Sequence, residues 1–135
     1  MLEQSPRGVS VTMGRILVID DDDNFRSMLC TALKQAGYTV VEAHNGHEGC
    51  ELQRMEPVDL VVTDIRMPER EGLETIQALR QEFPEIKIIA ISGGVGPLNF
   101  LPLARKFGAL GTLQKPFSLQ QLYEVLREVL PPPAL

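Results

Sequence analysis

Four short apolar runs in this chain are each followed by polar side chains that can take part in chemistry. Asp20 and Asp21 follow the first run, Asp64 the second, Ser92 the third and Lys115 the fourth. If these runs are parallel strands of one sheet, their carboxyl ends meet at one edge, where open α/β sheets bind ligands. Carboxylates gathered there would repel one another unless a cation lay between them. The pattern therefore predicts a metal site with a hydroxyl and an ammonium beside it, and hard oxygen donors favour Mg²⁺.

The composition is that of one globular domain with no feature of a nucleic-acid-binding or membrane protein. The chain has 135 residues, of which 44% are hydrophobic and 23% charged, and its net charge is −5. This length suits a single domain, and the acidic balance disfavours direct binding to nucleic acid. No apolar run approaches the roughly 20 residues of a membrane helix, and no signal peptide is recognisable. We therefore expect a cytoplasmic protein.

Apolar residues along the chain predict five strands that alternate with five helices. The strands are predicted at residues 15–19, 38–43, 58–63, 86–91 and 110–114. Helical spacing predicts a helix after each strand, and the fourth helix is expected to begin near Asn99 with Pro102 in its first turn. Such alternation implies right-handed crossovers and a doubly wound, three-layer α/β fold with a five-stranded parallel sheet, (βα)5. One domain is expected at 15–130, with tails at 1–14 (flexible) and 131–135.

Two local features qualify these helices. Asp22 or Asp23 can cap the first helix and interact favourably with its dipole, so neither is assigned to the metal site. Gly46 and Gly49 lower the helix propensity of the second helix, which is expected to be the weakest of the five.

Two cysteines and two histidines are assigned no chemical role, although both residue types often take part in catalysis or metal binding. Cys30 and Cys50 fall in helix-like segments without metal-ligand spacing, so we expect free, buried thiols of a reducing compartment. His44 and His47 flank an Asn-Gly pair, and we expect both to be exposed loop residues.

The motifs at the predicted strand ends resemble those of the receiver domains of bacterial two-component response regulators, which have a flavodoxin-like fold. The resemblance spans roughly residues 15–130. It rests on the acidic pair after the first strand, on Asp64-Ile65-Arg66-Met67-Pro68 with Gly72 beyond it, on Ser92, and on Lys115-Pro116-Phe117. It implies a stand-alone receiver similar to the chemotaxis regulators.

The resemblance also implies a role for each acidic residue. A carboxylate oxygen can attack phosphorus when the charge on the phosphoryl group is neutralised. Asp64 would be the phosphoacceptor. Mg²⁺ would be held by Asp20, Asp21, Asp64 and the backbone carbonyl of Arg66. Such a protein is not an enzyme in the ordinary sense, although it assists its own phosphorylation and dephosphorylation.

Lys115 and Ser92 would complete the catalytic set by the same resemblance. Lys115 would pair first with Asp64 and then with a phosphoryl oxygen, and Ser92 would turn its hydroxyl toward the phosphoryl group. Receivers of this family typically have a cis peptide bond after the lysine, which the sequence Lys115-Pro116 permits.

The implied partners are proteins that donate or read the phosphoryl group. The donor would be a sensor histidine kinase or a histidine phosphotransfer protein. An unidentified downstream protein would read the fourth helix, fifth strand and fifth helix, and a homodimer through that face is a further option. Most receivers have an aromatic residue three positions before the lysine, where this chain has Thr112. We therefore expect Ser92 and the loop at 93–97 to transmit the switch.

Two other interpretations remain open from the sequence. Asp20-x-Asp22 also matches the nucleophile and acid of a haloacid-dehalogenase-like phosphatase, although the chain is short for that fold and the motif at Asp64 would have no role. A receiver-like scaffold that works without phosphorylation is favoured by Thr112 alone.

Overall fold

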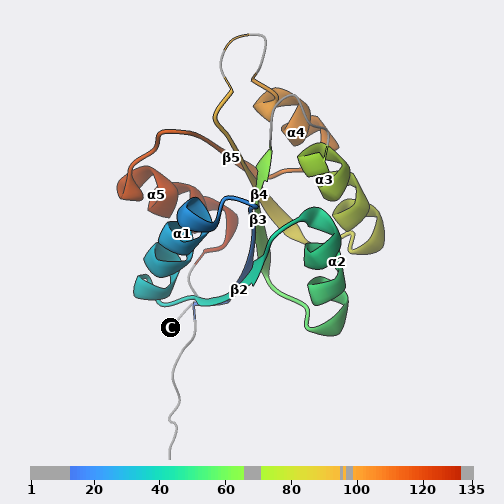
Figure 1. Cartoon of the computed structure of the whole chain (residues 1–135), viewed down its shortest axis with the longest axis horizontal. Coiled ribbons are helices and arrows are strands. Elements are labelled where there is room, and N and C mark those ends of the chain that lie inside the picture. The colour runs from blue at the N-terminus through green and yellow to red at the C-terminus, as the bar shows by residue number, and fades with distance from the viewer. Residues whose placement is uncertain (1–12, 66–70, 95, 97–98, 132–135) are drawn as a thin grey trace, which may run out of the picture.

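Each predicted strand and helix has a counterpart in the structure, a computed structural model that describes residues 13–65, 71–94, 96 and 99–131. Strands and helices alternate throughout these residues (Figure 1). In chain order they are β1 (Arg15–Ile19), α1 (Asp23–Gln35), β2 (Thr39–Ala43), α2 (Gly46–Met55), β3 (Leu60–Ile65), α3 (Glu71–Glu82), β4 (Lys87–Ser92), α4 (Leu101–Phe107), β5 (Gly111–Gln114) and α5 (Leu119–Val129).

The strands form one parallel sheet in the order β2-β1-β3-β4-β5, which confirms the predicted flavodoxin-like α/β fold. The register aligns the ends of the strands. Ile19 pairs with Thr63, and Ser92 pairs with both Ile65 and Gln114. The residues that follow β1 and β5 therefore lie at the same edge as the last residues of β3 and β4.

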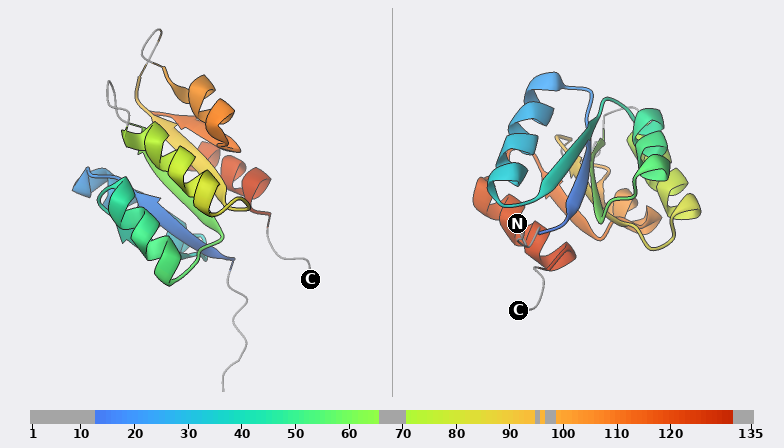
Figure 2. Two further views of the ribbon diagram at one scale, coloured as in Figure 1. Left: turned by 90° about the vertical axis from the view of Figure 1, so that its right-hand side faces the viewer. Right: turned by 90° about the horizontal axis from the view of Figure 1, so that it is seen from below.

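Helices cover both faces of the sheet and enclose two apolar cores. One face carries α1 and α5, and the other carries α2, α3 and α4 (Figures 1 and 2). Successive residues of a strand point to opposite faces. In β1, Ile16 and Val18 join the core on the side of α1 and α5, whereas Leu17 and Ile19 join the other core. Because both faces are covered, the three central strands β1, β3 and β4 are apolar over most of their length rather than alternating.

Helix starts agree with the expected capping residues, with one shift. Asp22 is the N-cap of α1, and its Oδ1 accepts hydrogen bonds from the backbone amides of Asn24 and Phe25 at 3.0 and 3.1 Å. Helix α4 begins at Leu101 rather than near Asn99, because the Asn99 side chain instead accepts a hydrogen bond from the Leu101 amide at 3.0 Å. Pro102 lies in the first turn of α4, as predicted.

Strands β3 and β4 end later than the apolar pattern predicted. Strand β3 continues through Asp64 to Ile65, and β4 includes Ser92. A polar residue at a strand end still pairs through its backbone, which hydrophobic periodicity does not report. None of the described helices has the length and apolar character that a membrane span requires.

Candidate functional site

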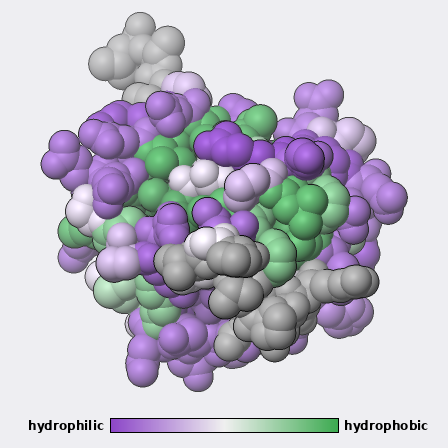
Figure 3. Space-filling model, turned by 90° about the horizontal axis from the view of Figure 1, so that it is seen from above, coloured by the Kyte–Doolittle hydropathy of each residue, from purple (hydrophilic) through white to green (hydrophobic). Residues whose placement is uncertain are grey.

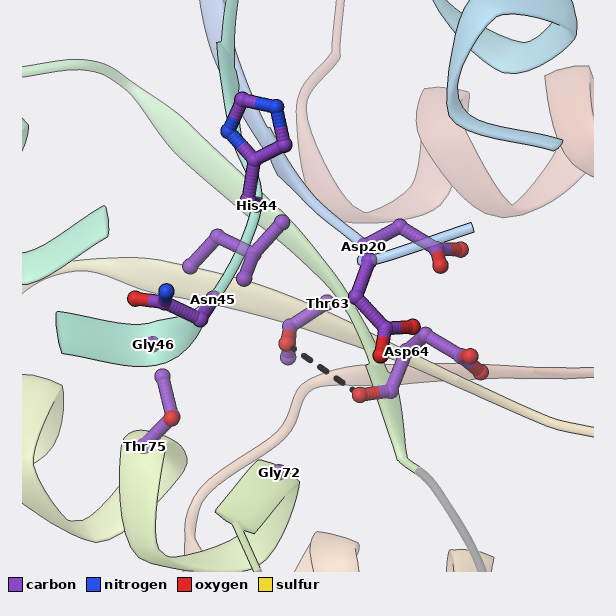
Figure 4. A pocket seen from close by; sticks show the side chains of 10 residues that line it. Asp20, His44, Asn45, Gly46, Thr63, Asp64, Gly72 and Thr75 are labelled. Carbon is purple, nitrogen blue, oxygen red and sulfur yellow. Dashed lines mark hydrogen bonds between the residues drawn. The ribbon is translucent and has the colours of Figure 1, made fainter. Parts of the chain in front are cut away.

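The carboxyl ends of β1 and β3 line a small cavity at the sheet edge (Figure 4). Its volume of about 20 Å³ is close to the space that one water molecule needs. Among the residues that line it are Asp20, Asp21, Thr63, Asp64 and Thr75. The predicted acidic residues therefore meet at one place, although more than 40 residues of sequence separate Asp21 from Asp64.

Asp20 is the most buried of these carboxylates, with 4% of its surface exposed. Its Oδ1 accepts a hydrogen bond from the Asp22 amide at 2.9 Å, whereas Oδ2 is buried without a hydrogen-bond partner among the described residues. Burial raises the pKa of Asp20, and the negative charges of Asp64 and Asp21 raise it further against the opposing effects of the Asp22 hydrogen bond and Lys115. A cation beside Oδ2 would relieve both the desolvation and the repulsion.

Asp64 and Lys115 approach each other across the edge, as the sequence predicted. The Lys115 Nζ lies 3.5 Å from Asp64 Oδ2, and 28% and 11% of the respective side chains are exposed. The Lys115 backbone amide donates to the Ser92 carbonyl at 2.8 Å, which fixes the start of the loop after β5. The Lys115-Pro116 bond is cis, in agreement with the resemblance.

Ser92 is fully buried at the end of β4 and is engaged with its own loop. Its Oγ accepts a hydrogen bond from the Gly94 amide at 3.1 Å. The Gly94 carbonyl in turn accepts from the Gln114 side chain at 2.8 Å. Ser92 thus lies at the predicted edge and is connected through Gly94 to the end of β5. Arg66, the fourth predicted metal ligand, lies outside the described residues.

Two residues of α1 support the site and were not predicted from the sequence. The buried Arg26 guanidinium donates to the Asp20 carbonyl at 2.7 Å and to Glu42 at 3.0 Å. The Phe25 ring lies under the Lys115 ammonium, with 3.9 Å between Nζ and the ring centroid. An arginine among the apolar positions of a helix is a signal for the first contact, whereas the Phe25 contact depends on how α1 packs.

The histidines and cysteines stand apart from the carboxylates. Both histidines are exposed, as predicted, but His47 lies in the first turn of α2 rather than in a loop. The His44 ring points away from the carboxylates (Figure 4), and its Nδ1 lies 3.0 Å from Glu48 Oε1. Cys30 and Cys50 are buried free thiols. Burial raises the pKa of both, that of Cys30 to about 11, so neither is a thiolate at neutral pH.

The face around the strand ends is largely polar. Viewed from above, hydrophilic side chains surround smaller hydrophobic areas (Figure 3). Such a surface suits a site that a charged group reaches from solvent.

Comparisons with known proteins connect this geometry to a family. The family model for the response regulator receiver domain matches residues 16–127. The chain is 35% identical over 122 residues to the response regulator receiver protein CpdR of Brucella abortus (strain 2308), covering 87% of this chain and 98% of that protein. It is also 40% identical over 119 residues to the sensor kinase CckA of the same organism, covering 85% of this chain but only 12% of the kinase.

A solved structure shows the same architecture over nearly the whole chain. The CheY-like response regulator receiver domain protein from Methanospirillum hungatei JF-1 superposes with a TM-score of 0.78 at 29% identity, covering 90% of this chain and 94% of that one. Because the family model and a relative of nearly equal length agree with the fold, the chain belongs to the response regulator receiver domain family, whose members receive phosphoryl groups in two-component phosphorelays.

Proposed function

We propose that this receiver accepts a phosphoryl group on Asp64 and thereby changes the surface that a downstream protein reads. The observation that carries the proposal is the approach of Lys115 Nζ to within 3.5 Å of Asp64 Oδ2, beside the buried Asp20. Receiver domains interact with histidine kinases. The donor is accordingly a phosphohistidine of a sensor kinase or of a histidine phosphotransfer protein in the cytoplasm.

The transfer needs only a nucleophile and charge neutralisation from this chain. A carboxylate oxygen of Asp64 forms a bond to phosphorus as the P–N bond of the phosphohistidine breaks, and the electron pair of that bond stays on the imidazole nitrogen. Lys115 neutralises charge on the phosphoryl oxygens during the transfer. The Ser92 hydroxyl then donates a hydrogen bond to a phosphoryl oxygen.

The acidic residues fit a magnesium ion, which receiver domains generally bind at this pocket. Asp20 offers a buried oxygen without a hydrogen-bond partner in the described structure, and Asp21 and Asp64 line the same cavity. Within the described ranges, no three His, Cys, Asp or Glu side chains converge closely enough to hold an ion by themselves. Waters, which Mg²⁺ retains, and the Arg66 carbonyl would complete the coordination. When bound, the ion would supply positive charge that offsets the negative charge of the phosphoryl group.

The output surface is proposed to be α4, β5 and α5, for a downstream protein or a second copy of the chain. At Thr112, where most receivers carry an aromatic ring, the hydroxyl accepts a hydrogen bond from Arg105 Nη2 at 3.2 Å. The signal is therefore proposed to travel from Ser92 through the loop after β4 rather than through an aromatic ring. Residues 15–130 are the proposed functional unit.

Intact-mass analysis after incubation with acetyl phosphate and Mg²⁺ tests the proposal. The wild type is expected to gain one phosphoryl group, and Asp64→Asn is expected to gain none. Asp59→Asn is the matched control, because Asp59 lies before β3 at the other end of the sheet, where its Oδ2 accepts a hydrogen bond from the Arg15 amide at 2.8 Å. A phosphoryl group that persists in Asp64→Asn contradicts the assignment. Repeated turnover of a phosphate ester would instead favour the phosphatase interpretation.

A further inference from the structure

We propose that Phe25 is a positioning residue for phosphoryl transfer, because its ring face holds the Lys115 ammonium in place beside Asp64. The inference rests on the proposed roles of Lys115 and Asp64 and adds to them a residue on a different element, the first turn of α1.

Asp64 alone does not fix the lysine. The 3.5 Å between Lys115 Nζ and Asp64 Oδ2 exceeds the roughly 2.7–2.9 Å of a charge-assisted hydrogen bond. The lysine side chain is long and has several rotatable bonds, and 28% of it is exposed to solvent. The second close contact of the ammonium is the Phe25 ring, whose centroid lies 3.9 Å from Nζ. That distance is well inside the roughly 6 Å within which a ring face attracts a cation.

The Phe25 ring is itself held from two directions. Its backbone amide donates to the N-cap Asp22 Oδ1 at 3.1 Å, which anchors the residue in the first turn of α1. Its ring packs against that of Phe117, with centroids 6.0 Å apart and planes at 87°. Phe117 lies two residues beyond Lys115, so the loop after β5 contacts the same ring through both its ammonium and its aromatic side chain.

A ring face suits this task better than a further carboxylate would. The ring attracts the cation through its quadrupole but accepts no proton, so it leaves the N–H donors of the ammonium available to oxygen. It also adds no negative charge to a site that already holds Asp20 and Asp64. The positive charge of Lys115 is therefore in place before the phosphoryl group arrives, as electrostatic preorganisation requires.

Simple packing of the lysine stem on an apolar side chain is the competing explanation, and ring electronics separate the two. Fluorinated phenylalanines at position 25 keep the shape of the ring while progressively weakening its negative face. We expect the rate of phosphorylation by acetyl phosphate with Mg²⁺, followed by intact mass, to fall with each added fluorine, by about two- to fivefold for the trifluoro ring. Phe25→Leu should slow the reaction similarly, and Phe25→Trp should retain the wild-type rate.

Matched substitutions at Phe83 provide the control. Phe83 packs against the core on the opposite face of the sheet from Phe25, away from the ammonium. Trifluorophenylalanine at position 83 is therefore expected to leave the rate unchanged. Equal rates for all fluorinated rings at position 25 would overturn the proposal, because packing of the Lys115 stem on an apolar side chain would then explain the contact.

A measurement without phosphorylation separates this inference from the proposed function. In ¹H–¹³C spectra of the unphosphorylated chain, the ε-methylene protons of Lys115 should be shifted upfield by the ring current, and Phe25→Leu should remove that shift. If the wild type shows the shift but never gains a phosphoryl group, the proposed function fails while the contact stands. If the wild type is phosphorylated and the shift is absent, the role of Phe25 is refuted.

Discussion

At the scale of single residues, Asp20 shows the cost of building an acidic site. One of its oxygens accepts the Asp22 amide, and the other is buried without a hydrogen-bond partner in the described structure. Burial raises the pKa of Asp20 above its ordinary 3.8, so the folded chain binds a proton there more readily than the unfolded chain does. Keeping Asp20 ionised at neutral pH therefore costs stability until a cation binds.

Asp20→Asn is expected to stabilise the metal-free chain at pH 7 by about 1–3 kcal/mol, the range for a buried polar group left unsatisfied. The amide keeps the acceptor for the Asp22 N–H and removes the charge. The difference between variant and wild type should be small below pH 3.8, grow as the pH rises through the raised pKa of Asp20, and then level off. Urea denaturation at several pH values measures it.

With Mg²⁺ bound, the wild type should be more stable than Asp20→Asn. A ligand that binds only the folded chain stabilises it by an amount that grows with the ratio of ligand concentration to Kd, so excess Mg²⁺ should stabilise the wild type more than Asp20→Asn. If the variant is less stable than the wild type without metal, ionised Asp20 does not destabilise the fold. If the variant gains as much stability from Mg²⁺ as the wild type does, Asp20 is not a ligand of the ion.

The residues of the site differ in how readily they can be predicted from the sequence. Asp64, Ser92 and Lys115 were predictable because each stands at the end of an apolar run, and the parallel register brings such ends together. Phe25 and Arg26 were not, because apolar spacing reports only which face of α1 is buried. Their contacts with Lys115 and Asp20 depend on how far α1 leans over the sheet edge.

At the scale of elements, two glycines allow α2 to pack closely against its neighbours, an effect that helix propensity does not include. A Cβ on Gly49 would lie 2.4 Å from Cδ1 of Ile19, and one on Gly46 would lie 1.8 Å from Oγ1 of Thr75. Helix α2 therefore approaches β1 and α3 more closely than any other residue at these two positions would allow. Helix propensity, on which the expectation of a weak α2 depends, could not reveal this reason for the two glycines.

Gly49→Ala is expected to destabilise the fold by about 1–3 kcal/mol, the usual cost of overpacking a core. The sign is informative, because alanine in a helix interior is otherwise favoured over glycine by about 1 kcal/mol. Ile19→Val removes the clashing Cδ1, so the double variant should be more stable than the sum of the single effects predicts. Urea denaturation of the three variants completes the cycle, and a stabilising Gly49→Ala would disprove the tight contact.

At the scale of the whole molecule, the alternation of strands and helices was enough to predict the layers and the sheet. It was not enough to predict where β3 ends or where α4 begins. A polar residue can complete a strand, as Asp64 does, or begin a turn, as Asn99 does. The contact between β5 and the loop after β4 also needed the structure. The Gln114 side chain joins the loop after Ser92 to β5 through the Gly94 carbonyl.

Gln114→Leu should weaken that connection without blocking phosphorylation. With beryllofluoride and Mg²⁺ as a phosphoryl mimic, amide shifts at Thr112 and Leu113 are expected to be at least halved in the variant, while the phosphorylation rate stays close to that of the wild type. Gln120→Leu is the control, because the Gln120 amide contacts only Glu124 of the same helix in the described structure, at 3.4 Å. Undiminished shifts in Gln114→Leu would mean that the signal reaches β5 by another path.

The two buried thiols have a practical consequence for following such motions. The chain has only two cysteines, and neither forms a thiolate readily at neutral pH. A third cysteine could be placed at an exposed position such as Leu119, where 56% of the residue's surface is accessible. It would react with maleimide dyes or spin labels far faster than the native pair. Site-specific labelling of α5 thus requires no replacement of the two native cysteines, and distance measurements can be made on an otherwise unaltered chain.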